Sequence, residues 1–193
     1  KKKKKMKKIV VILSLLMTPV VLSAQSIFEK YEDQEHVTSV VVNQKMFKML
    51  ANIDLQTNDP DSDAFINQVK MLDNLTVFTT DNIGVSNSMK KDVDKYIKSS
   101  KLEELMRIKD GDQTVNFFVL EGKDDNHVKE LLMFVNGLGD ITKEENISIN
   151  GKQRVIETVL LSLTGDIDLR QVSKLTNQLN VPGGDQLKKA TKK

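Results

Sequence analysis

The chain contains no cysteine and no tryptophan, and only two of its 193 residues are tyrosine. Without cysteine there is no disulfide bond, no thiolate nucleophile and no lipidated N-terminal cysteine, so we expect the core alone to stabilise the fold. The shortage of tryptophan and tyrosine argues against a platform of aromatic rings on which sugars would stack. Several classes of exported protein are therefore excluded before any motif is considered.

Motifs of catalysis and cofactor binding are missing as well. There is no Gly-x-Ser-x-Gly or His-Glu-x-x-His sequence, and Gly137-Leu138-Gly139 lacks the third glycine of a dinucleotide-binding loop. The two histidines, His36 and His127, lack the spacing of zinc ligands and are interpreted as solvated. We predict no catalytic residue, no cofactor-binding residue and no cofactor.

One short acidic segment resembles the start of a calcium-binding loop. Asp59, Asp61 and Asp63 alternate as they would at the start of a calcium-binding loop. Such a loop needs glycine at its sixth position and glutamate at its twelfth, where this chain has Ala64 and Lys70. We interpret the aspartates as an acidic helix start, where the helix dipole favours negative charge, and predict no metal site.

The N-terminal segment has the pattern of a secretory signal peptide, which we assign to residues 1–24. Two lysines after Met6 are followed by an apolar segment from Ile9 to Leu22 and a small-residue end at Ala24. A transmembrane helix needs roughly 20 apolar residues, so this segment is too short to be one. We predict cleavage between Ala24 and Gln25. The five lysines before Met6 are left out of the interpretation of the fold.

Removal of the leader changes the charge of the chain. Residues 1–24 contain seven lysines and no acidic residue, so the remainder has 22 basic and 27 acidic residues and a net charge of −5 instead of +2. A negative chain without a basic stripe does not favour nucleic acid as a partner. We expect a periplasmic or secreted protein with no stable membrane anchor after processing.

Hydrophobic spacing predicts one α+β domain over residues 25–185, followed by a disordered basic tail at 186–193. Segments that are β-branched, alternating or continuously apolar are expected to form about six strands in one sheet: Val37–Val42, Leu75–Thr79, Leu102–Ile108, Val115–Val119, Val128–Val135 and Val155–Thr164. Helical spacing is found in Ile27–Tyr31, Met46–Ile53, Pro60–Leu72, Val85–Ile97 and Leu169–Leu179. Strands alternate with helices early and form an antiparallel meander late, with the helices mainly on one face.

Local signals add detail to this outline. The polar segment 137–154 is expected to be a loop or a flexible hairpin tip, and 165–168 to end the last strand. Asp168 and Gln171 have capping-box spacing, so a helix should begin there, with Leu175 and Leu179 covering the strand. Six methionines on apolar stripes are interpreted as core, the alternative being an adaptable binding surface: Met46, Met49, Met71, Met89, Met106 and Met133.

The chain resembles a known family, the domain-of-unknown-function family 4252, in these places: Phe28–Tyr31, Val37–Val40, Glu130–Val135, Val159–Leu169, Leu175 and Leu179–Pro182. The resemblance extends over about residues 27–182. Members are exported or lipidated proteins of Gram-negative envelopes, so the resemblance implies a location and a fold but no activity. This chain lacks the lipidation cysteine that some members carry.

Three functions remain open at this stage. We favour a non-enzymatic envelope protein that binds or senses a partner, such as another envelope protein. The alternatives are a carrier of a small ligand and an acid-dependent hydrolase with no recognisable motif. A concave pocket with convergent polar groups would distinguish a ligand-binding protein from one with only a filled core.

Overall fold

The computed structural model describes residues 27–52, 60–144, 148–149, 152–153 and 155–171. Its elements follow one another as η1 Glu29–Tyr31, β1 Val37–Asn43, α3 Gln44–Asn52, α4 Pro60–Lys70, β2 Leu72–Thr80, α5 Ile83–Ser99, β3 Glu103–Asp110, β4 Gln113–Glu121, β5 His127–Asn136, α6 Gly139–Glu144, β6 Ser148–Ile149, β7 Lys152–Gln153 and β8 Thr158–Asp168. The signal peptide, Asp59, the helix beyond Gln171 and the basic tail are sequence predictions that lie outside the described residues.

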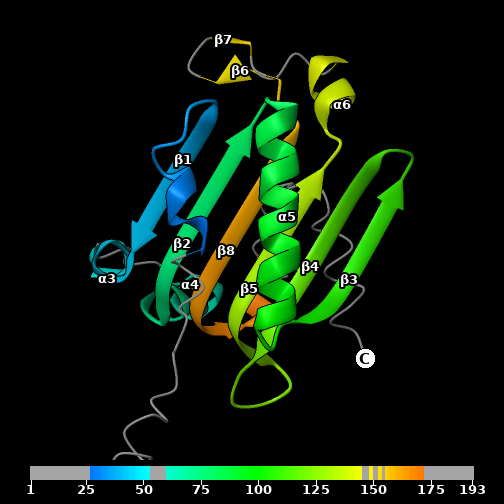
Figure 1. Cartoon of the computed structure of the whole chain (residues 1–193). Coiled ribbons are helices and arrows are strands. Elements are labelled where there is room, and N and C mark those ends of the chain that lie inside the picture. The colour runs from blue at the N-terminus through cyan, green and yellow to red at the C-terminus, as the bar shows by residue number, and fades with distance from the viewer. Residues whose placement is uncertain (1–26, 53–59, 145–147, 150–151, 154, 172–193) are drawn as a thin grey trace, which may run out of the picture.

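A six-stranded antiparallel sheet forms the centre of the molecule, in the order β1-β2-β8-β5-β4-β3 (Figure 1). The prediction of an α+β fold with six strands in one sheet is confirmed. Strands β3, β4 and β5 form the expected meander, and β3 and β4 are joined by a tight turn at Gly111, whose φ is +56°. The last strand, β8, is inserted between β2 and β5.

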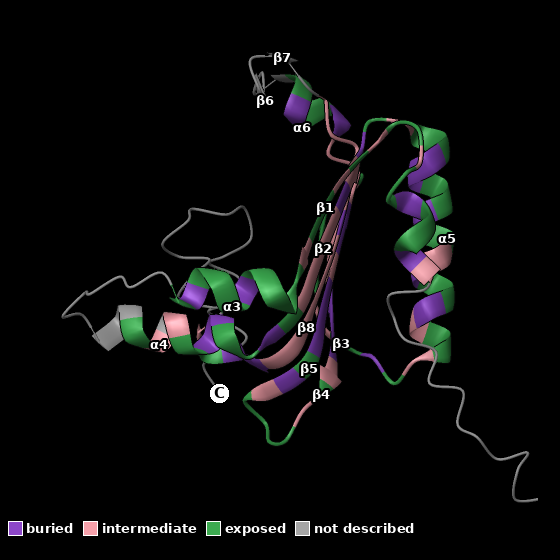
Figure 2. Cartoon of the chain, turned by 90° about the vertical axis from the view of Figure 1, so that its left-hand side faces the viewer, coloured by how far each residue is buried: buried purple, intermediate pink, exposed green. Residues whose placement is uncertain are grey.

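Helices lie on both faces of the sheet, whereas the sequence analysis placed them mainly on one. Figure 2 shows α5 on one side and α3 and α4 on the other. The α5 face carries one apolar core, in which Phe78, Leu132 and Leu160 of the sheet are fully buried. The opposite face carries a second core, with Phe47 of α3 and Ile167 of β8. Two helical layers are needed because the central strands are apolar on both faces.

Helix α5 follows directly from the sequence. Asn82 caps its first turn, since its side-chain oxygen accepts a hydrogen bond from the Val85 N–H at 3.1 Å. Three apolar residues at helical spacing, Met89, Val93 and Tyr96, are buried against the sheet. Among the helices described, none has the length and apolar character needed to cross a bilayer.

Strand β8 extends through residues 165–168 and ends at Asp168. The sequence analysis ended this strand at Thr164, and that boundary is wrong. Gly165 lies within β8 with a φ of +140°, beside shifts of register in both neighbouring pairings. Glycine has no Cβ and tolerates this conformation, which places the Asp166 N–H 3.0 Å from the Met71 carbonyl. The glycine therefore makes a bulge inside the strand instead of a turn after it.

The segment 137–154 also differs from its prediction as a loop or flexible hairpin tip. Its described residues contain the short helix α6 and the two-residue strands β6 and β7, which pair with each other. Thr142 is buried and fixes α6, because its hydroxyl donates to the Ile156 carbonyl at 3.0 Å and accepts from the Ile156 N–H at 2.9 Å.

Candidate functional site

A cavity of about 370 Å³ opens at the β1 side of the sheet, on the face that also carries α5. We call it the η1 pocket, because Glu29 of η1 and the flanking Phe28 and Glu32 form one wall. In Figure 1, η1 is part of the blue segment beside β1 and β2. The register places its floor residues side by side across three strands, with Val41, Thr76 and Ser162 in one row. The complete lining is Phe28, Glu29, Glu32, Val41, Asn43, Gln44, Asp73, Asn74, Thr76, Phe78 and Ser162.

The charges of the η1 pocket are of one sign. Glu29, Glu32 and Asp73 line it, and its lining contains no lysine or arginine. Asp73 accepts a hydrogen bond of 2.7 Å from Gln44 Nε2, and Lys48 Nζ donates to Gln44 Oε1 at 3.0 Å. One lysine therefore lies at the α3 side of the mouth, against three carboxylates. Together with the buried rings of Phe28 and Phe78, this lining suits a ligand with a cationic group on an apolar stem.

A buried carboxyl group lies beside the floor of the η1 pocket, on the same face of the sheet. Glu130 of β5 is only 3% exposed, and Ser162 donates to its Oε1 at 3.2 Å. The Tyr96 hydroxyl donates to Glu130 Oε2 at 2.7 Å. Burial raises the pKa of Glu130, although both hydrogen bonds act in the opposite direction. Burial, followed by the charge of Glu130, also raises the pKa of Tyr96.

The wall formed by η1 is anchored to α5. The Tyr31 side chain is fully buried, and its hydroxyl donates to Asp92, which also pairs with Lys30 at 2.6 Å. Phe28 packs edge-on against Tyr96 with ring centroids 5.3 Å apart. These contacts fix the position of Glu29 and its neighbours relative to the sheet, so the pocket is preformed.

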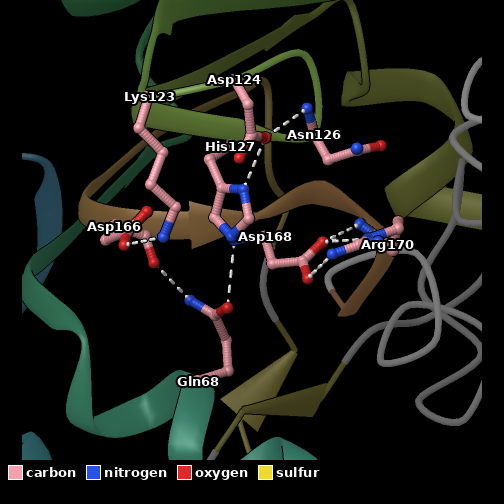
Figure 3. A network of polar contacts seen from close by, with 8 residues as sticks. All are labelled: Gln68, Lys123, Asp124, Asn126, His127, Asp166, Asp168 and Arg170. Carbon is pink, nitrogen blue, oxygen red and sulfur yellow. Dashed lines mark hydrogen bonds and ion pairs between the residues drawn. The ribbon is translucent and has the colours of Figure 1, made fainter.

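A second polar site surrounds the turn between β4 and β5 (Figure 3). His127 Nδ1 lies 2.7 Å from Asp124 Oδ1, and this hydrogen bond lowers the pKa of Asp124. Lys123 pairs with Asp166 at 2.6 Å, which ties the turn to β8. A cavity of about 470 Å³ adjoins the turn, but its lining contains no serine, threonine or cysteine that His127 could activate.

The contacts around this turn are those of a structural clamp. Gln68 of α4 donates to the Asp166 carbonyl at 2.9 Å and accepts from the Asp168 N–H at 3.0 Å, so it replaces strand pairing beside the bulge. The Asp168 carboxylate accepts from the Arg170 backbone N–H at 2.9 Å, as expected of a residue at a helix start. Arg170 also pairs with Asp168 at 2.7 Å and lowers its pKa.

The structure does not bring together the histidines, aspartates and glycines that the sequence analysis considered as possible site residues. His36 precedes β1 with a φ of +63°, and its carbonyl accepts from the Thr80 hydroxyl at 2.7 Å, whereas His127 begins β5, three strands away. Asp63 is exposed on α4. Gly137 follows β5, and Gly139 is the first residue of α6. Among the described residues, no group of three or more acidic or histidine side chains is placed to hold a metal ion.

The methionines divide into two groups. Met89 is buried and Met106 and Met133 are half-buried, as expected of core residues. The interpretation as core is wrong for three others, which are exposed because they lie on the outer sides of α3 and at the end of α4: Met46, Met49 and Met71.

The fold and the site together define an α+β protein with one six-stranded antiparallel sheet and a preformed acidic pocket. The family model described as "Domain of unknown function (DUF4252)" matches residues 31–175, and the chain belongs to this family. No curated protein and no solved structure matched the chain.

Proposed function

We propose that this protein is a non-enzymatic binding module of the cell envelope, and that the η1 pocket is its binding site for a cationic group of a ligand or partner. The observation that carries the proposal is the lining of the pocket, in which three carboxylates surround an apolar and amide-lined floor without a lysine or arginine. A pocket of this size with a few convergent polar groups is the usual form of a binding site.

The lining of the pocket fits the binding of a cation better than it fits hydrolysis by a serine nucleophile. A serine hydrolase at this site would use Ser162 with Glu130 as its base, since Ser162 lines the pocket and donates to that carboxyl. The negative charge that develops on a substrate oxygen during acyl transfer requires donors or cations. Glu29, Glu32 and Asp73 would oppose that charge. The same carboxylates stabilise a bound cation, so they favour a binding role.

The proposed location in the cell envelope is supported by the sequence of the N-terminal leader. The basic residues after Met6, the apolar segment and the small-residue end at Ala24 support export and processing. A protein of the envelope is the partner that this location supplies.

The test is a titration of the ¹⁵N-labelled processed chain with cadaverine, a diamine with an apolar stem, followed by NMR. We expect the backbone signals of Val41, Thr76 and Ser162 to shift. Glutarate, a dicarboxylate of the same length, should leave them unchanged. The double variant Glu32→Gln/Asp73→Asn should weaken the cadaverine effect at least several-fold, and Glu121→Gln, in the other cavity, should not. Equal shifts with glutarate, or cadaverine shifts confined to the Asp124–His127 turn, would refute the proposal.

A further inference from the structure

The two edges of the sheet differ in chemistry. The β3 edge carries five charged residues among its eight: Glu103, Glu104, Arg107, Lys109 and Asp110. Charges on an edge strand prevent other chains from pairing with it. Strand β1, at the opposite edge, has the sequence VTSVVVN and carries no charge and no proline. Only one of the two edges is therefore protected against strand addition.

The unprotected edge is exposed on both faces. Val40 is 50% exposed on the α3 face, and Val41 is 47% exposed on the α5 face. In the part of the chain that the structure describes, β1 pairs only with β2. In an antiparallel pair, every second residue directs its N–H and C=O away from the partner strand. Within the described ranges, strand β1 thus presents backbone groups without a partner strand, and apolar side chains, at the same edge.

The free edge continues into the η1 pocket. Val41 and Asn43 belong to β1 and also line the pocket. A strand added to β1 would lie about 4.8 Å from it, and its residue opposite Val41 would direct its side chain to the same face. A lysine or arginine at that position has a stem long enough to follow the apolar wall and place its cation among Glu29, Glu32 and Asp73.

We propose that β1 receives an extended segment of a partner protein as a seventh strand, with a lysine or arginine opposite Val41 whose cation occupies the η1 pocket. The proposal rests on the proposed function, since it uses the same pocket. Backbone pairing supplies affinity in strand addition, and pockets for alternate side chains supply specificity. Here the backbone groups come from β1 and the specificity from the three carboxylates.

A second copy of this chain fits the edge less well. Strand β1 contains no lysine or arginine, so no register of β1 against its own copy supplies a cation opposite Val41. Pairing of two copies about Val40 would place Ser39 there and bring two acidic pockets toward one interface. The charges therefore favour a basic partner segment over self-association.

The probe is the peptide acetyl-Thr-Val-Thr-Lys-Thr-Val-Thr-amide, with twins that carry glutamate or norleucine at the centre. Binding to the processed chain is followed by NMR titration, by hydrogen exchange of the β1 and β3 amides, and by intermolecular NOEs. We expect the lysine peptide to protect β1 amides and to bind at least tenfold more tightly than the glutamate twin. Glu32→Gln/Asp73→Asn should abolish this preference but leave NOEs between the peptide and β1, and Glu121→Gln should change neither.

Four other results would each contradict the inference, and each would identify the part of it that is wrong. If the three peptides bind β1 equally, the cationic side chain is not recognised. If no peptide protects β1 while cadaverine still shifts the pocket signals, strand addition fails and the proposed function stands. If the peptides protect β3, the charged edge is the one that pairs. If the chain sediments as a dimer that Val40→Lys converts to a monomer, a second copy occupies the edge.

Discussion

Glu130 combines deep burial with two neutral donors. A buried carboxylate is costly unless it is paired or hydrogen-bonded, and here Tyr96 and Ser162 supply the partners instead of a cation. The carboxyl group is thereby held beside the pocket floor, between Ser162 of β8 and Tyr96 of α5. Because burial raises the pKa of Glu130, this residue opposes folding more strongly when it is ionised.

Replacement of Glu130 by glutamine should reveal that cost as a pH dependence. Below the ordinary carboxyl pKa of about 4.3, the group is protonated in both the folded and the unfolded chain. As pH rises from there through the raised folded pKa, the unfolded chain loses its proton more readily, so the parent loses stability that the variant keeps. Urea unfolding across this range should show Glu130→Gln gaining stability relative to the parent, and the exposed Glu121→Gln should show no such trend. A difference that is constant with pH would contradict the assignment.

At the scale of elements, the β8 bulge is the feature that positions the pocket floor. Gly165 allows β8 to shift its register against β2 and β5, and the residues before it, including Ser162, keep their places on the α5 face. A Cβ at Gly165 would clash with the Met71 carbonyl oxygen and lie 2.8 Å from Leu72 Cα. Both neighbours are backbone atoms, so neither can rotate away.

Gly165→Ala should therefore be much more damaging than Gly111→Ala. Gly111 has a φ of +56°, and no atom lies within 4 Å of the place that an alanine methyl group would take, so the substitution there should cost only the left-handed backbone penalty of about 1 kcal/mol. At Gly165 the strained φ of +140° costs roughly 1–3 kcal/mol and the clash adds to it, so we expect a loss of about 3 kcal/mol or more. Denaturant unfolding of both variants measures the difference. Equal losses would mean that β2 can move away from β8.

The strands were predictable because β-branched residues and alternation mark them locally, as in Val37–Val42 and Val115–Val119. Gly165 was misinterpreted because glycine marks turns and bulges alike, and only the approach of Met71 distinguishes them. The η1 pocket was not predictable, since its lining comes from segments as distant as Phe28 and Ser162. It forms through the strand order β1-β2-β8, which local patterns do not encode.

At the scale of the whole molecule, the proposed removal of the leader would reverse the sign of the net charge. With residues 1–24 the chain is basic, and without them it has a net charge of −5. In the processed protein that we propose, the overall field would attract cations, as the acidic rim of the η1 pocket does. The two effects act in the same direction for a basic partner segment.

If the protein is exported and processed, the mass of the mature chain should correspond to a start at Gln25. Expression of the chain from Met6 in a Gram-negative host should give a periplasmic species that begins at Gln25, because the leader has a basic start, an apolar segment and a small-residue end. Intact-mass analysis of the periplasmic fraction gives the N-terminus. A leader variant with Ala24→Pro, which obstructs the cleavage site, should accumulate the longer form. A parent protein that stays in the membrane with Ile9–Leu16 attached would support an anchor instead.

The position of β8 has a consequence for the order in which the molecule is assembled. Strands β1 and β2 form one half of the sheet and β5, β4 and β3 the other, and only β8 joins them. Because β8 is the last strand of the sheet to leave the ribosome, β2 and β5 have no neighbour between them until residues 158–168 have been synthesised. Pairings between residues so far apart in sequence also form slowly. A chain with this connectivity cannot complete its sheet before β8 has been synthesised, which suits the export of an unfolded chain that we propose.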